Sequence, residues 1–241
     1  MATPRILAGL VVVALVGAAC GSDATESTPT SAPMTVDESV AEAPAVGDTQ
    51  TADPMSAPAD CPPVDGTETQ TRSFGAAPPT CLEDGASYEA VVTTNKGEFT
   101  ITVDPESAPV AANNFVFLAR NQYFDATVCH RIVPNFVVQC GDPTATGTGG
   151  PGYTIVDEPP APGQYQIGSI AMAKTTAPDS AGSQFFIITG SDGAALPPDY
   201  ALFGQVTDGF ETTVQAMAAA ATRDGIPSET IEIQSIRIVQ S

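Results

Sequence analysis

Residues 86–241 consist largely of short stretches in which apolar and polar residues alternate, separated by turn-forming residues. A period of two predicts β-strands that bury one face. Such stretches lie at 88–94, 98–103, 128–133, 136–140, 167–173, 184–189, 201–206 and 230–239. Many short strands with few helices between them favour a closed antiparallel β-barrel over a parallel βαβ sheet.

Two segments predict helices instead of strands. Ser107 can cap a helix that has Pro109 in its first turn, and an apolar stripe with helical spacing follows it. A second helix is expected from Gly209 to about Thr222, with Phe210, Val214 and Met217 on one side. We therefore expect residues 86–241 to form a mainly β domain with two helices.

The residues before this domain have a different composition. Residues 21–85 carry 12 acidic residues, nine prolines and one arginine, with much Ser, Thr and Ala. So little apolar surface cannot offset the entropy lost on ordering a chain. The composition predicts a disordered linker over residues 20–85.

The N-terminus predicts export. Residues 1–19 contain Arg5 followed by an apolar run of 14 residues, which is short for a membrane span and typical of a signal peptide. Cys20 follows small residues and resembles the lipidated cysteine of bacterial lipoproteins, although Gly17 stands where those proteins usually have a larger aliphatic residue. The alternatives are secretion after cleavage and an uncleaved anchor; each of the three places the domain outside the cytoplasm.

Charge and cysteine content exclude some functions. The net charge of −20 argues against nucleic acid or an anionic membrane surface as partner, so contact with the membrane is expected only through the N-terminal lipid. Apart from Cys20 there are four cysteines, no CxxC pair and one histidine, so no metal site is expected. An even number of cysteines outside the cytoplasm suggests two disulfides, with three connectivities open.

Three motifs in order and spacing resemble the cyclophilin family of peptidyl-prolyl cis-trans isomerases. They are HRIVPNFVVQCGD at 130–142, AMAKTTAPDSAGSQFFI at 171–187 and LFGQV at 202–206, and GTGGPGY at 147–153 agrees as well. The resemblance covers about residues 88–240. It implies an eight-stranded antiparallel barrel closed by two α-helices, with a peptide groove on one face and isomerase activity (EC 5.2.1.8).

The resemblance also implies a set of site residues. It assigns catalysis to Arg131, Phe136 and Gln139. It assigns substrate binding to Val137, Ala173, Lys174, Gln184, Phe186, Leu196 and Tyr200. Val137, Lys174 and Tyr200 differ from the side chains that are common in the family, and Ala195 stands where many members have tryptophan. Because that indole mainly serves binding of the drug cyclosporin, we expect weak drug sensitivity with catalysis retained.

The implied reaction suits these side chains. Rotation about a peptide bond has a barrier of about 18–20 kcal/mol, and it breaks no covalent bond. An arginine can donate to the lone pair that the proline nitrogen regains when the bond is twisted, so no cofactor is needed. We expect a monomer that acts on proline-containing unfolded or extracytoplasmic polypeptides. The alternative is a proline-peptide-binding module with little or no turnover.

The hairpin that carries Arg131 also suggests a disulfide. If 128–133 and 136–140 pair as a tight antiparallel hairpin, Arg131 faces Gln139 and Cys129 faces Cys140 within bonding range. We hypothesise a Cys129–Cys140 disulfide, with Cys61–Cys81 as the second; the alternative is a pair of free buried thiols. His130 then points away from Arg131 and is expected to be a structural residue bonded to backbone.

Overall fold

The structure is a computed structural model, and it describes residues 60–241. The predicted signal peptide at 1–19, the lipidation of Cys20 and the first part of the predicted linker, 20–59, lie outside the described residues. Within 60–241, no helix is long and apolar enough to cross a membrane.

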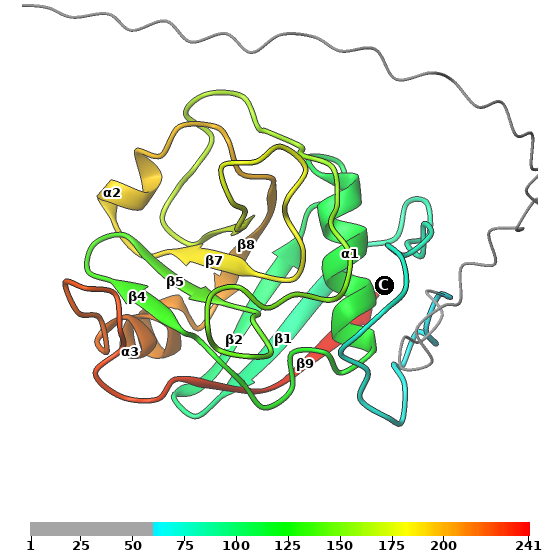
Figure 1. The fold of residues 1–241 in the computed structure, drawn as a ribbon, viewed down its shortest axis with the longest axis horizontal. Helices are drawn as coiled ribbons and strands as arrows, with labels where there is room; N and C mark the ends of the chain where they lie inside the picture. The colour runs from blue at the N-terminus through cyan, green and yellow to red at the C-terminus, as the bar shows by residue number, and fades with distance from the viewer. Residues whose placement is uncertain (1–59) are drawn as a thin grey trace, which may run out of the picture. The chain divides into compact units, whose positions relative to one another are not determined.

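In the described part of the chain, nine antiparallel strands form one curled sheet (Figure 1). They are β1 (Tyr88–Thr94), β2 (Gly97–Val103), β3 (Thr127–Val128), β4 (Arg131–Val133), β5 (Val137–Cys140), β6 (Ser169–Met172), β7 (Phe185–Ile188), β8 (Leu202–Asp208) and β9 (Glu232–Gln240). Their order across the sheet is β3-β9-β1-β2-β8-β6-β7-β5-β4. The mainly β, antiparallel architecture is therefore confirmed.

The strand count differs from the expected eight because the stretch 128–133 is divided. β3 pairs with β9, whereas β4 pairs with β5, so the chain changes partners at Cys129 and His130. The curled sheet is not closed by continuous strand pairing. Its seam is bridged by an isolated pairing of Val128 with Asp142 and by the Cys129–Cys140 disulfide.

Helix α1 (Pro109–Arg120) starts at the expected proline, but Ser107 does not cap it. Its N-cap residue is Ala108, whose side chain cannot accept a hydrogen bond, and the backbone N–H groups of Val110 and Ala111 donate to the two carboxylate oxygens of Glu158, at 2.9 and 2.8 Å. A distant carboxylate thus satisfies the free N–H groups that we expected a local hydroxyl to satisfy.

The second helix is shorter than expected. It begins as a π-helical turn (Phe210–Val214), continues as α3 (Gln215–Ala218) and ends before Thr222, because the Thr222 N–H donates to the carbonyl of Ile132 in β4. A further short helix, α2 (Ser191–Ala194), follows β7.

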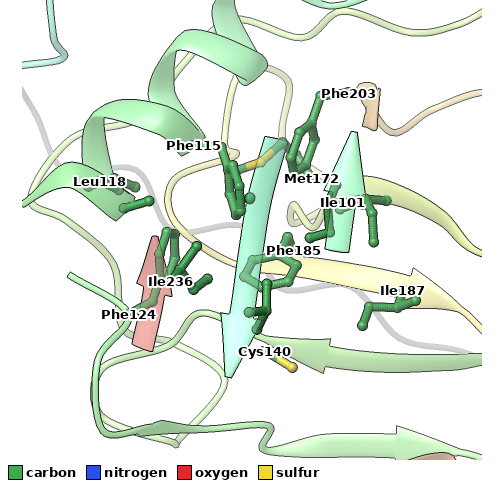
Figure 2. Close-up of a cluster of buried hydrophobic side chains, with 14 of the residues drawn as sticks. Ile101, Phe115, Leu118, Phe124, Cys140, Met172, Phe185, Ile187, Phe203 and Ile236 are labelled. Atoms are coloured by element: carbon green, nitrogen blue, oxygen red, sulfur yellow. The ribbon is translucent and has the colours of Figure 1, made fainter. Parts of the chain in front are cut away.

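The core lies between α1 and the concave face of the sheet (Figure 2). Phe115 of α1 contacts the rings of Phe124, Phe185 and Phe203 at centroid distances of 5.0–5.5 Å. β5, β6 and β7 each have a buried side chain in this core, and their alternate residues point to the opposite face. That opposite face carries the candidate site.

The prediction of a disordered linker is wrong for residues 60–85, which pack against the domain beside α1 (Figure 1). Phe74 is 2% exposed, its ring lies 4.9 Å from that of Phe117, and its N–H donates to the Pro151 carbonyl. The predicted Cys61–Cys81 disulfide is present. Average composition missed these contacts because they join individual residues of the segment to distant residues of the domain, including the hydrogen bonds from Thr67 to the Arg120 carbonyl and from Gln70 to the Gln122 carbonyl.

Candidate functional site

The hairpin β4–β5 presents Arg131 and Gln139 on the same face. The two residues are direct partners in the register, as predicted, and the Cys129–Cys140 disulfide joins the ends of the hairpin. The segment after α3 supports β4 from the other side, since the Ile132 N–H donates to the Gly225 carbonyl at 2.9 Å. Gly225 has a φ of +84°, a backbone conformation that favours glycine, and a Cβ there would lie in ordinary van der Waals contact with Cγ of Arg131, at 3.4 Å.

A chain of hydrogen bonds orients the arginine. Nη1 of Arg131 donates to Oε1 of Gln139 at 3.4 Å, and Nε2 of Gln139 donates to Oε1 of Gln184 at 3.0 Å. Nε2 of Gln184 in turn donates to the Gly149 carbonyl at 3.0 Å. A backbone carbonyl can only accept and a guanidinium can only donate, so both amides have a single orientation that satisfies every link.

Asp142 holds the loop that supplies this carbonyl. Its carboxylate is fully buried and accepts the backbone N–H groups of Thr144, Thr146, Gly147 and Gly149 at 2.6–3.1 Å. Burial alone would raise the pKa of Asp142, but the hydrogen bonds from Thr144, Gly149 and Gly147 outweigh it and lower the pKa to about 2. The carboxylate is therefore ionised throughout the physiological range and fixes the loop.

Beside the arginine lies a cavity of about 270 Å³. It is lined by Arg131, Phe136, Val137, Gln139, Ala173, Lys174, Phe186, Leu196 and Tyr200. These are nine of the ten residues to which the sequence assigned catalysis or substrate binding. The tenth, Gln184, does not line the cavity and instead contacts Gln139 from behind.

The cavity walls belong to a small apolar cluster separate from the main core. Phe186 and Tyr200 meet edge to face with centroids 5.3 Å apart, and the Arg131 guanidinium carbon lies 5.5 Å from the centre of the Phe136 ring. Within residues 60–241 the guanidinium makes no hydrogen bond other than that to Gln139. Its remaining N–H groups are thus available to a ligand beside the apolar walls of the cavity.

The turns around the cavity hold Phe136 in place. Thr189 N–H donates to the Phe136 carbonyl at 2.9 Å, and the side chain of Asn135 bonds both the backbone N–H and the hydroxyl of Ser191. A Cβ at Gly193 would lie 2.5 Å from the Phe136 carbonyl oxygen. The two turns therefore approach more closely than a larger residue would permit.

Lys174 lines the cavity, but its ammonium group forms an ion pair with the carboxylate of Asp157. The hydrogen bond from Lys174 is the main reason that the pKa of Asp157 lies below its usual value, and the backbone N–H of Asp179 adds to the effect. A substrate would therefore meet the backbone and the aliphatic stem at this position rather than a free cation.

His130 does not line the cavity, and the expected hydrogen bond to backbone is not formed. Neither ring nitrogen has a partner within residues 60–241, and burial lowers the pKa of His130, an effect that the charge of Asp142 partly offsets. A neutral histidine away from the cavity has no role as a general base there.

Sequence reasoning missed three groups that support the site. Tyr165 donates its hydroxyl to the Tyr200 carbonyl at 2.6 Å and accepts the Tyr200 N–H at 2.9 Å. Asp157 restrains Lys174, and Asp142 fixes the Gly149 carbonyl. The only available signal was that Asp142 precedes a glycine-rich loop, because the contacts join residues that are distant in sequence.

Comparisons with known proteins agree with this geometry. The family model described as "Cyclophilin type peptidyl-prolyl cis-trans isomerase/CLD" matches residues 90–238. A probable peptidyl-prolyl cis-trans isomerase B from Mycobacterium leprae is 33% identical over 174 residues, covering 64% of this chain and 58% of that protein. A peptidyl-prolyl cis-trans isomerase B from Bacillus subtilis is 41% identical over 131 residues, covering 54% of this chain and 82% of the relative. The chain thus spans just over half the length of the mycobacterial relative.

Solved structures show the same fold. A Cryptosporidium parvum cyclophilin type peptidyl-prolyl cis-trans isomerase superposes with a TM-score of 0.59 at 32% identity, covering 64% of this chain and 98% of that one. A second structure of that protein, determined in the presence of the dipeptide Ala-Pro, gives a TM-score of 0.58 at 32% identity, with 63% and 98% covered.

Proposed function

The chain belongs to the cyclophilin family of peptidyl-prolyl cis-trans isomerases, and we propose that it catalyses the isomerisation of X-Pro bonds. The observation that carries the proposal is the cavity that combines apolar walls with an arginine whose donors are largely free. A proline ring fits a small apolar pocket of this kind. The relative determined in the presence of Ala-Pro supports a proline-containing ligand.

In the proposed mechanism, Arg131 acts only in the twisted state. The planar imide nitrogen shares its lone pair with the carbonyl, so it accepts no hydrogen bond, whereas the twisted nitrogen regains the lone pair. A guanidinium beside the apolar walls donates to that lone pair and so stabilises the transition state more than either ground state. Gln139 orients the guanidinium, while Phe136, Phe186 and Leu196 hold the ring as the preceding carbonyl turns.

The experiment is an NMR exchange assay on a short blocked peptide with a single Ala-Pro bond. We expect Arg131→Ala to lower kcat/KM by at least about a hundredfold, because a donor aimed at developing charge typically contributes that much. Arg131→Lys, which keeps the charge without the fork, should recover only part of the rate. Arg237→Ala removes a charge from an exposed site on β9 and serves as the control.

The alternative function is peptide binding without turnover. Val137 and the absence of tryptophan leave that alternative open. If wild-type protein binds the peptide but does not accelerate exchange, the binding module replaces the enzyme. If Arg131→Ala exchanges the peptide as fast as wild type does, the role of the arginine is wrong.

We propose further that the domain works outside the cytoplasm, held to the membrane by a lipid on Cys20, and assists the folding of exported proteins. The signal-like residues 1–19 and the two disulfides support this location. A diacylglyceryl mass on the mature N-terminus, and release of the protein into the medium on Cys20→Ala, are the expected results. Retention of an unmodified Cys20 variant at the membrane would contradict the lipid anchor.

A further inference from the structure

A second and larger concave surface lies beside the cavity at Arg131 and Phe136, which we call the proline cavity. Its volume is about 1050 Å³, roughly four times that of the proline cavity. One wall is the segment 78–87, the floor comes from β2 and β8, and the N-terminal end of α1 completes it. We call this surface the extension groove.

The wall of the extension groove is fixed in position. The Cys61–Cys81 disulfide fastens it, the Cys81 N–H donates to the Asn113 side chain at 2.7 Å, and that side chain donates to the Pro79 carbonyl at 2.9 Å. The Glu83 N–H also donates to the Tyr88 hydroxyl. Residues 78–87 lie outside the span 90–238 that the family model matches, so this wall is an addition to the family domain.

The charge of the extension groove selects its occupant. Its lining contains four acidic residues and no Lys, Arg or His; the acidic residues are Glu83, Asp84, Asp104 and Glu106. The two ion pairs found within residues 60–241 lie elsewhere, at Lys96–Glu229 and Lys174–Asp157. The floor adds side-chain amides and hydroxyls, and both apolar and polar atoms are exposed in it. An extended polypeptide that carries Lys or Arg complements such a surface.

The same charge excludes two other occupants. Residues 21–59 of this chain contain seven acidic residues and no basic one, so they would be repelled. A second copy of a protein with a net charge of −20 would be repelled as well. The charge therefore favours a different polypeptide as the occupant.

The extension groove adjoins the proline cavity across the segment 164–166. Gln164 and Gln166 line the groove, whereas Tyr165 between them belongs to the cluster that walls the cavity. Leu202 lines the groove and also packs against that cluster. One extended polypeptide can thus occupy both surfaces.

We propose that the extension groove binds a basic segment of the same polypeptide whose X-Pro bond occupies the proline cavity. The inference rests on the proposed isomerase function and adds a substrate class to it: chains with Lys or Arg several residues from the proline. The groove holds the substrate, while the chemistry remains at Arg131.

The test compares peptides that share one Ala-Pro bond. A short blocked tetrapeptide reaches only the cavity. Two longer peptides extend the tetrapeptide by ten residues on either side. The lysine peptide carries two lysines in the extensions, and the matched glutamine peptide carries two glutamines at the same positions. The full chain, a Glu83→Gln/Asp84→Asn variant, and a control variant Asp65→Asn/Glu68→Gln with the same charge change are titrated at low and high salt.

The wild-type chain is expected to bind the lysine peptide about fivefold more tightly than the glutamine peptide at low salt, with the difference reduced at high salt. The groove variant should lose most of that preference, the control variant should keep it, and all three should isomerise the tetrapeptide equally. Equal losses in the two variants, or no preference in the wild type, would overturn the proposal. Failure of all three to isomerise the tetrapeptide would instead contradict the isomerase function, while the titrations still report on the groove.

Discussion

Replacement of Phe74 by alanine tests whether residues 60–85 are part of the folded unit. The side chain is 2% exposed and its ring contacts those of Phe117 and Tyr153, at centroid distances of 4.9 and 6.3 Å. Removing a buried phenylalanine costs about 3–5 kcal/mol, through lost burial and the cavity that remains. Because the alanine backbone can still donate to the Pro151 carbonyl, we expect about 4 kcal/mol from the side chain alone.

The assay is urea unfolding of the full chain, followed by near-UV circular dichroism, with thermal unfolding in parallel. A loss of about 4 kcal/mol corresponds to a fall in Tm of roughly 8–16 °C for a domain of this size. Val64→Ala in the same segment is the control, since Val64 is 48% exposed and its truncation should change stability by less than about 0.5 kcal/mol. A loss below about 1 kcal/mol for Phe74→Ala would refute the packing of this segment on the domain.

Three further predictions concern the candidate site. A Cys129→Ser/Cys140→Ser variant should lose about 3 kcal/mol of unfolding free energy, as expected for a disulfide between residues 11 apart, and should isomerise the peptide more slowly. Unchanged values in urea unfolding and in the exchange assay would contradict the role of the disulfide. Asp142→Asn should lower kcat about fivefold with KM little changed, because Asp142 positions the Gly149 carbonyl that orients Gln184. In a Gln184→Leu background the same substitution should cause no further loss of kcat, and additive losses would refute this route. The pKa of Asp142 is about 2 in the folded chain and 3.8 ordinarily, so the ionised carboxylate contributes about 2 kcal/mol to the free energy of unfolding above pH 4. This contribution is lost as the pH falls through 2. Between pH 5 and pH 2.5, urea unfolding should therefore show a smaller loss of stability for Asp142→Asn than for the wild type. Ala195→Trp should raise affinity for cyclosporin in titration calorimetry, and no gain would show that this position does not govern drug binding.

The ordered motifs predicted the cavity residues through the resemblance to the family, and the strand register accounts for the four that lie on strands: Arg131, Val137, Gln139 and Phe186. Once β4 and β5 form a tight hairpin, Arg131 must face Gln139, and Cys129 must lie near Cys140. The alternation at 184–189 likewise separates Phe185, which is in the main core, from Phe186, which lines the cavity. Local spacing is sufficient for residues of this kind.

The expectations that failed concern partners that are far apart in sequence. Ser107 was a suitable helix cap, yet Glu158 supplies the carboxylate. His130 was expected to bond to backbone, yet its ring nitrogens have no hydrogen-bond partner in the part of the chain that the structure describes. The second helix ends early because Thr222 pairs with Ile132. For Ser107 and for the second helix, a tertiary contact outweighed a local preference of about 1 kcal/mol.

Residue patterns determined most strands and the hairpin with its arginine and disulfide, because strand geometry acts over a few residues. The resemblance of the ordered motifs to the family supplied most of the other side chains around the cavity. Tertiary structure decided that residues 60–85 join the domain, that Asp142 and Gly149 orient the glutamines, and that an acidic groove forms beside the cavity. These features depend on which distant surfaces meet, and their free energies appear only when the chain has folded.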